Sequence, residues 1–243
     1  MFYNIVFKHV MGRKAKEIID LSSSLADIWR VLSEEERDLI RKNARFVHYK
    51  KNEAIYIEEE QPQDLMCLLK GKVKIFKNGV GGRVQIIRMI RPIQYFGYRA
   101  YFAREPYVTA ASAFEPSTVC LISMELIEEM LRKNGNLALL FIQMLSCDLG
   151  VADNRVVNLT QKHVRGRLAE SLIFLKESYG LEEDGATINI YLAREDLANL
   201  SNMTTANAIR TLANFVNERI ISLDGRKIKI IDEDKLLKIS KIG

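Results

Sequence analysis

Several residue types that carry chemistry or cross-link a fold are scarce in this chain. Its 243 residues include only three cysteines and three histidines. The cysteines, Cys67, Cys120 and Cys147, are odd in number and far apart, which argues against a disulfide framework and against paired zinc ligands. The dispersed histidines form no HxH or HExxH pattern, and no GxSxG nucleophile motif occurs. We therefore predict no metal site and no catalytic residue; an enzyme built on a small β-barrel is the competing class.

Proline and glycine are also few, at four and 13 residues, whereas 48% of the chain is hydrophobic, which is typical of a folded protein of one large or two modest domains. The sequence shows no obvious transmembrane run and no secretory signal at its start. We expect a cytoplasmic protein without a membrane partner. The net charge of +5 is compatible with an anionic partner, although the positive excess in the C-terminal third is confined to residues 204–231.

Short β-prone runs broken by turn residues fill the region from Arg45 to Ser123. Regularly spaced short strands of this kind predict a closed roll or barrel. A short helix beginning near Ser33 precedes it, and Met124–Lys133 is expected to be a second short helix. We assign residues 1–134 to this N-terminal domain. The expected strands are Phe46–Tyr49, Ala54–Ile57, Leu65–Leu69, Lys72–Phe76, Val84–Ile90 and Val119–Ile122.

A much longer helix is expected over residues 135–162. Apolar and amide side chains recur along it at alternating intervals of three and four, the pattern of a coiled-coil seam. Two interpretations are open: the seam joins two copies of the chain, which we favour, or it packs on its own domain. The predicted seam residues are Leu137, Leu140, Met144, Cys147, Val151 and Asn154.

Residues 192–221 read as two short helices joined by a turn at residues 201–203, the pattern of a helix-turn-helix. Thr204 is placed to cap the second helix, which would bury Ala208, Ile209 and Leu212. An Asp-Gly turn and alternating basic and apolar residues follow, which indicates a β-hairpin wing. Helix pairs also occur in proteins that do not bind DNA. The candidate DNA contacts are Arg194, Thr204, Thr205, Asn207, Arg210, Arg226 and Lys227.

The order of roll, long helix and winged helix-turn-helix resembles the CRP/FNR (cyclic-AMP receptor protein and fumarate-nitrate reduction regulator) family of bacterial transcription factors. The segments LLKGKVKIF, YFGYRAYF, VADNRVVNLTQKHVRGRLAESL and DLANLSNMTTANAIRTL carry the resemblance. It implies an α+β fold with a cyclic-nucleotide-binding-like β-roll, a dimerisation helix (135–162) and a DNA-binding domain (163–243). It also implies a homodimer that binds a twofold double-stranded DNA site and changes the recruitment of RNA polymerase.

The chain departs from the resemblance where family members bind cyclic nucleotides. Tyr98 stands where such members carry a glutamate, and Val108, ahead of Thr109, stands where they carry an arginine. Ala152 and Asp153 replace the paired hydroxyl residues of the dimer helix. Because a phosphate then lacks its guanidinium partner, we expect that cyclic AMP does not bind strongly.

The identity of any effector or cofactor is therefore unknown from the sequence. Arg99 or Arg104 could bind another anion, or both could be solvated. The cysteines are not spaced like ligands of an iron–sulfur cluster, which is not expected, whereas a haem ligand among the isolated histidines stays open. A roll that binds nothing is the remaining alternative. In the reading helix, Ala206 replaces a glutamate frequent in the family, so we expect a different DNA half-site.

Overall fold

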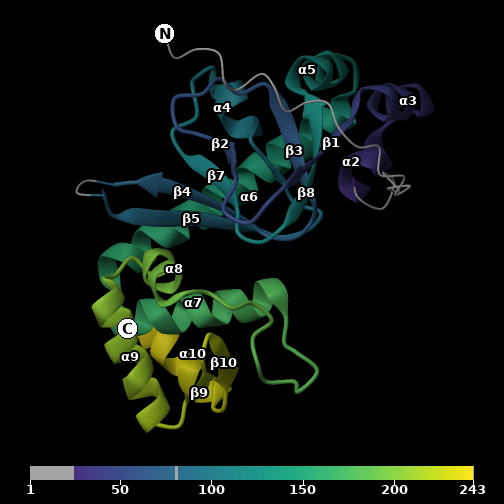
Figure 1. Ribbon diagram of the computed structural model, residues 1–243. Helices are drawn as coiled ribbons and strands as arrows, with labels where there is room; N and C mark the ends of the chain where they lie inside the picture. The colour runs from purple at the N-terminus through teal and green to yellow at the C-terminus, as the bar shows by residue number, and fades with distance from the viewer. Residues whose placement is uncertain (1–24, 80–81, 243) are drawn as a thin grey trace.

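The computed structural model describes residues 25–79 and 82–242 as an N-terminal β-roll and a C-terminal helical domain joined by one long helix (Figure 1). The helices are α2 (Ala26–Val31), α3 (Glu34–Asn43), α4 (Tyr98–Ala103), α5 (Met124–Lys133), α6 (Gly135–Gln161), α7 (Val164–Tyr179), α8 (Arg194–Leu200), α9 (Thr205–Asn217) and α10 (Glu233–Ile242). The strands are β1 (Arg45–Tyr49), β2 (Ala54–Tyr56), β3 (Asp64–Lys70), β4 (Val73–Asn78), β5 (Val84–Ile90), β6 (Tyr95–Phe96), β7 (Ala110–Ala113), β8 (Ser117–Ser123), β9 (Ile221–Asp224) and β10 (Lys227–Ile230).

The roll consists of two four-stranded antiparallel sheets, with strand orders β1-β8-β3-β6 and β2-β7-β4-β5. Alternate side chains of both sheets, such as Leu68, Ile75 and Val119, are buried between them. Gly71 turns the chain from β3 into β4 at φ +93°, where a Cβ would lie 2.4 Å from the Ser117 Oγ. The predicted roll is confirmed.

Two strands of the roll are missing from the sequence-based prediction. β6 has only two residues, and β7 consists of the small residues Ala110–Ala113, which have little intrinsic preference for strands. β7 nevertheless pairs with both β2 and β4 and is fully buried. Tertiary contacts therefore determine its conformation.

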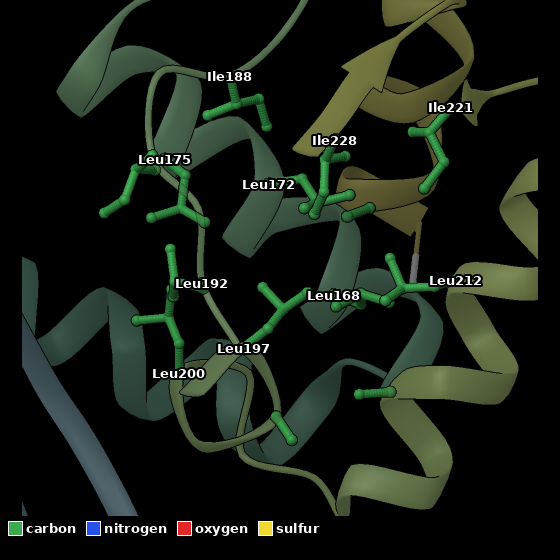
Figure 2. Close-up of a cluster of buried hydrophobic side chains, with 14 of the residues drawn as sticks. Leu168, Leu172, Leu175, Ile188, Leu192, Leu197, Leu200, Leu212, Ile221 and Ile228 are labelled. Atoms are coloured by element: carbon green, nitrogen blue, oxygen red, sulfur yellow. The ribbon is translucent and has the colours of Figure 1, made fainter. Parts of the chain in front are cut away.

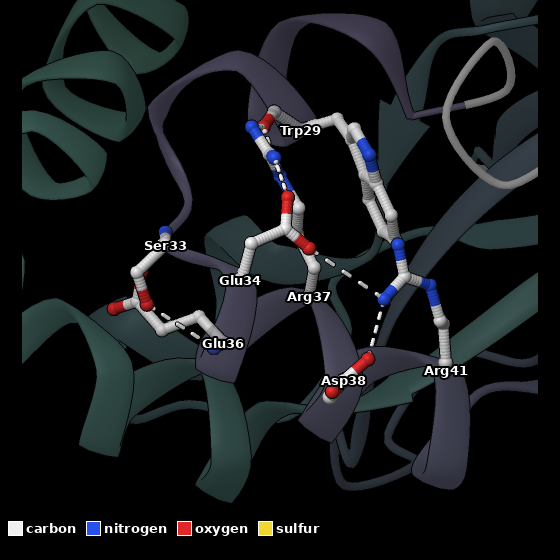
Figure 3. A network of polar contacts seen from close by, with 7 residues as sticks. All are labelled: Trp29, Ser33, Glu34, Glu36, Arg37, Asp38 and Arg41. Carbon is white, nitrogen blue, oxygen red and sulfur yellow. Dashed lines mark hydrogen bonds and ion pairs between the residues drawn. The ribbon is translucent and has the colours of Figure 1, made fainter.

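The start of α3 follows from local hydrogen bonding, as its sequence predicts. The Ser33 Oγ accepts from the Glu36 amide at 3.2 Å, and the Glu36 carboxylate accepts from the Ser33 amide at 2.8 Å. Figure 3 shows the neighbouring network, in which the Arg37 guanidinium donates to the Trp29 carbonyl and Arg41 lies over the indole ring, 5.1 Å from its centre. This network fixes α2 against α3 at one end of the roll.

α6 has 27 residues and is about 40 Å long. The Asn134 Oδ1 caps it by accepting from the Leu137 amide at 3.0 Å. In the described part of the chain it is the one helix long and apolar enough to cross a membrane, with a mean hydropathy of 1.5, and only 11% of that window is buried. The expectation of no such run was therefore wrong for α6. Since Leu137 and Phe141 anchor it in the roll core, its remaining apolar surface needs another explanation.

The C-terminal domain has its own hydrophobic core (Figure 2). Leu168 and Leu172 of α7 meet Leu197 of α8, Leu212 of α9 and Ile228 of the hairpin there. α10, for which we made no prediction, packs along α7 through Leu236. These contacts hold the helix pair and the hairpin as one unit.

The C-terminal domain is also attached to the roll directly. The Lys74 ammonium pairs with Asp196 of α8 at 3.0 Å, and the Gln85 amide donates to the Asn199 carbonyl at 2.7 Å. The half-buried guanidinium of Arg155 on α6 bridges the two sides by donating to backbone carbonyls of β5 and to the Leu200 carbonyl. α8 thus lies against β5, which orients α9 relative to the long helix.

Candidate nucleic-acid interface

α8, a three-residue turn and α9 form a helix-turn-helix, as the sequence predicts. Asn202 in the turn has φ 50°, a left-handed conformation that asparagine tolerates. The Ser201 hydroxyl, buried beside it, hydrogen-bonds to the Ser171 hydroxyl at 2.8 Å. The Thr204 Oγ1 accepts from the Asn207 amide at 3.2 Å and caps α9. The first turn of α9 is thereby fixed and exposed.

The two faces of α9 differ in character, and one prediction about them is wrong. Ala208, Leu212 and Phe215 are buried, but Ile209, which we expected in the core, has 51% of its surface exposed. Thr211 is buried instead, because it lies three residues after Ala208 and four before Phe215 and so shares their side of the helix. Ile209 therefore belongs to the outward face.

The polar side chains predicted to read DNA lie on or beside this outward face. Thr204, Thr205 and Arg210 are exposed, and Asn207 is half-buried. The Arg210 guanidinium donates to the Asn207 Oδ1 at 2.7 Å, which orients it while leaving other N–H groups available. A guanidinium so held can donate to two acceptors of a guanine edge.

The wing, formed by β9 and β10, is closed by Gly225 at φ +55°. An acidic loop lies against it: Lys227 pairs with Glu182 and Lys229 with Asp184, both at 3.2 Å. Hydrogen bonds from the Thr187 and Ala186 amides hold the pKa of the Asp184 carboxyl well below its usual range. The wing lysines are thus partly neutralised.

Arg226 and Arg194 differ in what they contact. Arg226, at the wing tip, is exposed and has no ion-pair partner among residues 25–79 and 82–242. Arg194 donates to the Gly225 carbonyl at 2.7 Å, and burial lowers the pKa of its guanidinium. Its contact attaches the start of α8 to the wing turn, so Arg194 is better placed to position the wing than to contact DNA itself.

The roll region expected to hold an effector is occupied by protein side chains. Tyr98 is 3% exposed and packs edge-on against Phe141 of α6. Its hydroxyl donates to the Asp148 carboxylate at 3.0 Å, and Arg88 of β5 donates to the same carboxylate at 2.7 and 2.6 Å. Burial, and then the Asp148 charge, raise the pKa of the Tyr98 phenol.

The other predicted effector residues do not converge on Tyr98. Arg99 is paired with Glu105 at 2.8 Å on the surface, and Val108 is 41% exposed. Ala152 and Asp153 are exposed on α6. Thr109 is half-buried. The sequence reasoning missed Arg88 and Asp148, since these two residues are 60 positions apart and neither lies in a recognisable motif.

The seam predicted for α6 also needs correction. Leu137 is fully buried in the core of its own roll, and Leu140 and Met144 pack partly against that core. Leu137 is therefore not free to contact a partner, whereas Cys147, Val151 and Asn154 are exposed. The apolar residues that α6 leaves open are Leu139, Ile142, Leu149, Val151, Val156 and Val157.

Comparisons with known proteins agree with this architecture. The chain matches the Cyclic nucleotide-binding domain over residues 46–134 and the Crp-like helix-turn-helix domain over residues 166–239. The two matches cover most of the chain, in the order in which the roll and the helix-turn-helix occur. The chain belongs to the CRP/FNR family of transcription regulators. Its helix-turn-helix is therefore a DNA-binding unit, and the residue contacts above describe how this CRP/FNR member presents it.

Individual relatives are distant. The chain is 22% identical to the CRP-like cAMP-activated global transcriptional regulator of Mycobacterium tuberculosis, over 82% of this chain and 89% of that protein. It is 28% identical to the anaerobic regulatory protein of Bacillus subtilis, over 72% and 74%. The solved structure of FixK2 from Bradyrhizobium japonicum has the same fold, with a TM-score of 0.73 at 22% identity, covering 81% of this chain and 96% of that one.

Proposed function

We propose that this CRP/FNR regulator acts as a homodimer that reads a twofold-related DNA site. The observation that carries the proposal is the open apolar face of α6. Leu139, Ile142, Leu149 and Val156 are 64%, 59%, 63% and 61% exposed. They lie at intervals of three, seven and seven residues, which Ser146, Asp153 and Thr160 complete to a regular alternation of three and four.

This spacing supports a paired helix. An alternation of three and four keeps side chains on one side of a helix and suits packing against a second copy. Exposed apolar surface of this extent on one helix face ordinarily marks an interaction site. The face lies opposite Leu137, Phe141 and Asp148, which anchor α6 to the roll, so a partner can cover it without disturbing those contacts.

A dimer of this kind would place its two α9 helices about 34 Å apart, so that they enter successive major grooves on one face of the DNA. Such an arrangement favours an inverted-repeat site. By the role of its family, the protein would then contact RNA polymerase, act in the cytoplasm and have no catalytic activity.

The dimer proposal is tested by light scattering on the purified protein. We expect a mass about twice the 27.9 kDa of one chain and a monomer for Leu149→Glu, because a carboxylate in the seam costs desolvation. Leu39→Glu is the matched control: Leu39 is 43% exposed on α3, and this variant should stay dimeric. A monomeric wild-type protein, or a dimeric Leu149→Glu, would refute the proposal.

We further propose that the roll does not bind cyclic AMP in the usual way and that DNA binding is independent of an effector. The link from Tyr98 and Arg88 to Asp148 supports this second part, because protein side chains alone connect the roll to α6 there. A haem or another small anion acting elsewhere is the alternative.

Calorimetry with cyclic AMP, followed by thermal unfolding across a metabolite panel, tests this. We expect no heat of binding and no rise in the melting temperature, since a ligand of the folded state would raise it. Micromolar binding of cyclic AMP would contradict the first part. A metabolite that both stabilises the protein and changes its DNA affinity would contradict the second.

A further inference from the structure

The outward face of α9 contains an apolar side chain among the polar ones. Ile209 is 51% exposed and lies one turn beyond Thr205, next to Arg210. The core face of the helix is already filled by Ala208, Leu212 and Phe215. Ile209 thus has no role in the core of its own domain, although a branched aliphatic side chain gains by leaving water.

The neighbours of Ile209 are small. Ala206 and Ala213 lie three residues before it and four after it, so all three share one side of α9, and both alanines are exposed. Methyl side chains at these two positions let the helix backbone approach the floor of the major groove closely. A side chain as short as that of Ile209 contacts a base edge only when the helix backbone approaches the groove floor in this way.

An isoleucine at this position can make a favourable contact with only one of the four bases. It has no donor or acceptor, and in the major groove thymine alone presents an apolar group, its C5-methyl. Opposite the donor of cytosine or the acceptors of guanine, the same side chain would displace water without replacing its hydrogen bonds.

We propose that Ile209 is a specificity-determining residue of this regulator, which selects a thymine in each half-site by packing against the thymine methyl group. This inference rests on the proposed DNA-reading role of α9. It adds a contact that is apolar, whereas the contacts predicted from the sequence are all polar. Ala206, which lacks the glutamate frequent in the family, would then serve to admit Ile209 to the groove.

The test removes the thymine methyl group and the Ile209 side chain, first separately and then together. DNA selected by the full-length protein defines the half-site. Each thymine in it is then replaced by deoxyuridine, which lacks only the methyl group, and binding is measured for the wild type and for Ile209→Ala. Val216→Ala is the matched control, because Val216 is 37% exposed on the same helix but two turns further from the reading end. Circular dichroism checks that both variants fold.

At one thymine position of the half-site, deoxyuridine should weaken wild-type binding about fourfold, the effect of losing one buried methyl group. It should leave Ile209→Ala unaffected and should weaken Val216→Ala as it weakens the wild type. The proposal is overturned if no thymine shows this coupling, or if the selected half-site contains no thymine. Because both outcomes require a selected site, they are distinct from a failure to bind specific DNA at all.

Discussion

At the scale of single residues, the account depends on what each polar group contacts. Arg210 and Arg88 both donate to a nearby acceptor. Arg210 is exposed and hydrogen-bonds to Asn207, whereas Arg88 forms a salt bridge with Asp148. The sequence distinguishes them only in part. Arg210 follows a predicted cap and turn, so its place on a reading helix could be predicted, but the partner of Arg88 comes from a distant helix.

Replacing Arg210 by alanine should weaken specific DNA binding by about 1–3 kcal/mol and relax selectivity at one base pair. The guanidinium is the side chain best placed for a bidentate contact with guanine. A titration against the selected site and a scrambled site measures both effects. Lys238→Ala, an exposed cation on α10, is the control and should change neither.

Replacing Tyr98 by phenylalanine should lower the free energy of unfolding by about 1–2 kcal/mol, because the half-buried Asp148 carboxylate loses a hydrogen bond. Tyr101→Phe is the matched control, since the Tyr101 hydroxyl donates to Glu128 near the surface and should contribute less. Urea unfolding measures both variants. Equal stability of Tyr98→Phe and the wild type would show that this link does not support the roll.

At the scale of helices and strands, the sequence predicted those elements whose signals are local. The cap at Ser33, the Asp-Gly turn of the wing and the turn before Thr204 are determined by neighbouring residues, and all three are present. β7 and the buried side of α9 depend on distant contacts and were wrongly predicted or missed. In the seam predicted for α6, Leu137 is buried in its own domain instead, because periodicity identifies a helix face but not what covers it.

We predict that two adjacent cations of the wing, Arg226 and Lys227, contribute differently to DNA binding. Arg226→Ala should weaken DNA binding of all sequences and lower the slope of log affinity against log salt by about 1. Lys227→Ala should do less, because Lys227 is already paired with Glu182. Binding isotherms at several salt concentrations test this. Equal slopes for the two variants would mean that the acidic loop does not shield the wing.

At the scale of the whole molecule, buried tyrosines and cysteines make the free energy of unfolding depend on pH in the alkaline range. Burial raises the pKa of Tyr95, Tyr98, Tyr107, Tyr179, Cys67 and Cys120. In the unfolded chain these groups ionise near their ordinary values of 10.0 for tyrosine and 9.0 for cysteine. Above those values the unfolded state binds fewer protons than the folded state, so the free energy of unfolding falls as pH rises.

We therefore expect stability to be fully present below about pH 9 and to be lost progressively above it. Urea unfolding from pH 8 to pH 11 measures this. A free energy of unfolding that stays constant over that range would contradict the burial of these phenols and thiols.

The whole molecule also combines the separate inferences, because α6 connects the roll to the DNA-binding domain and carries the face that we propose binds a second copy. The measurement that tests this most directly is selection of bound DNA from a random pool by the purified protein, with no metabolite added. We predict an inverted repeat whose half-sites are centred about 10–10.5 base pairs apart, or a multiple of that spacing. A single unpaired half-site, or no enriched sequence at all, would contradict the account.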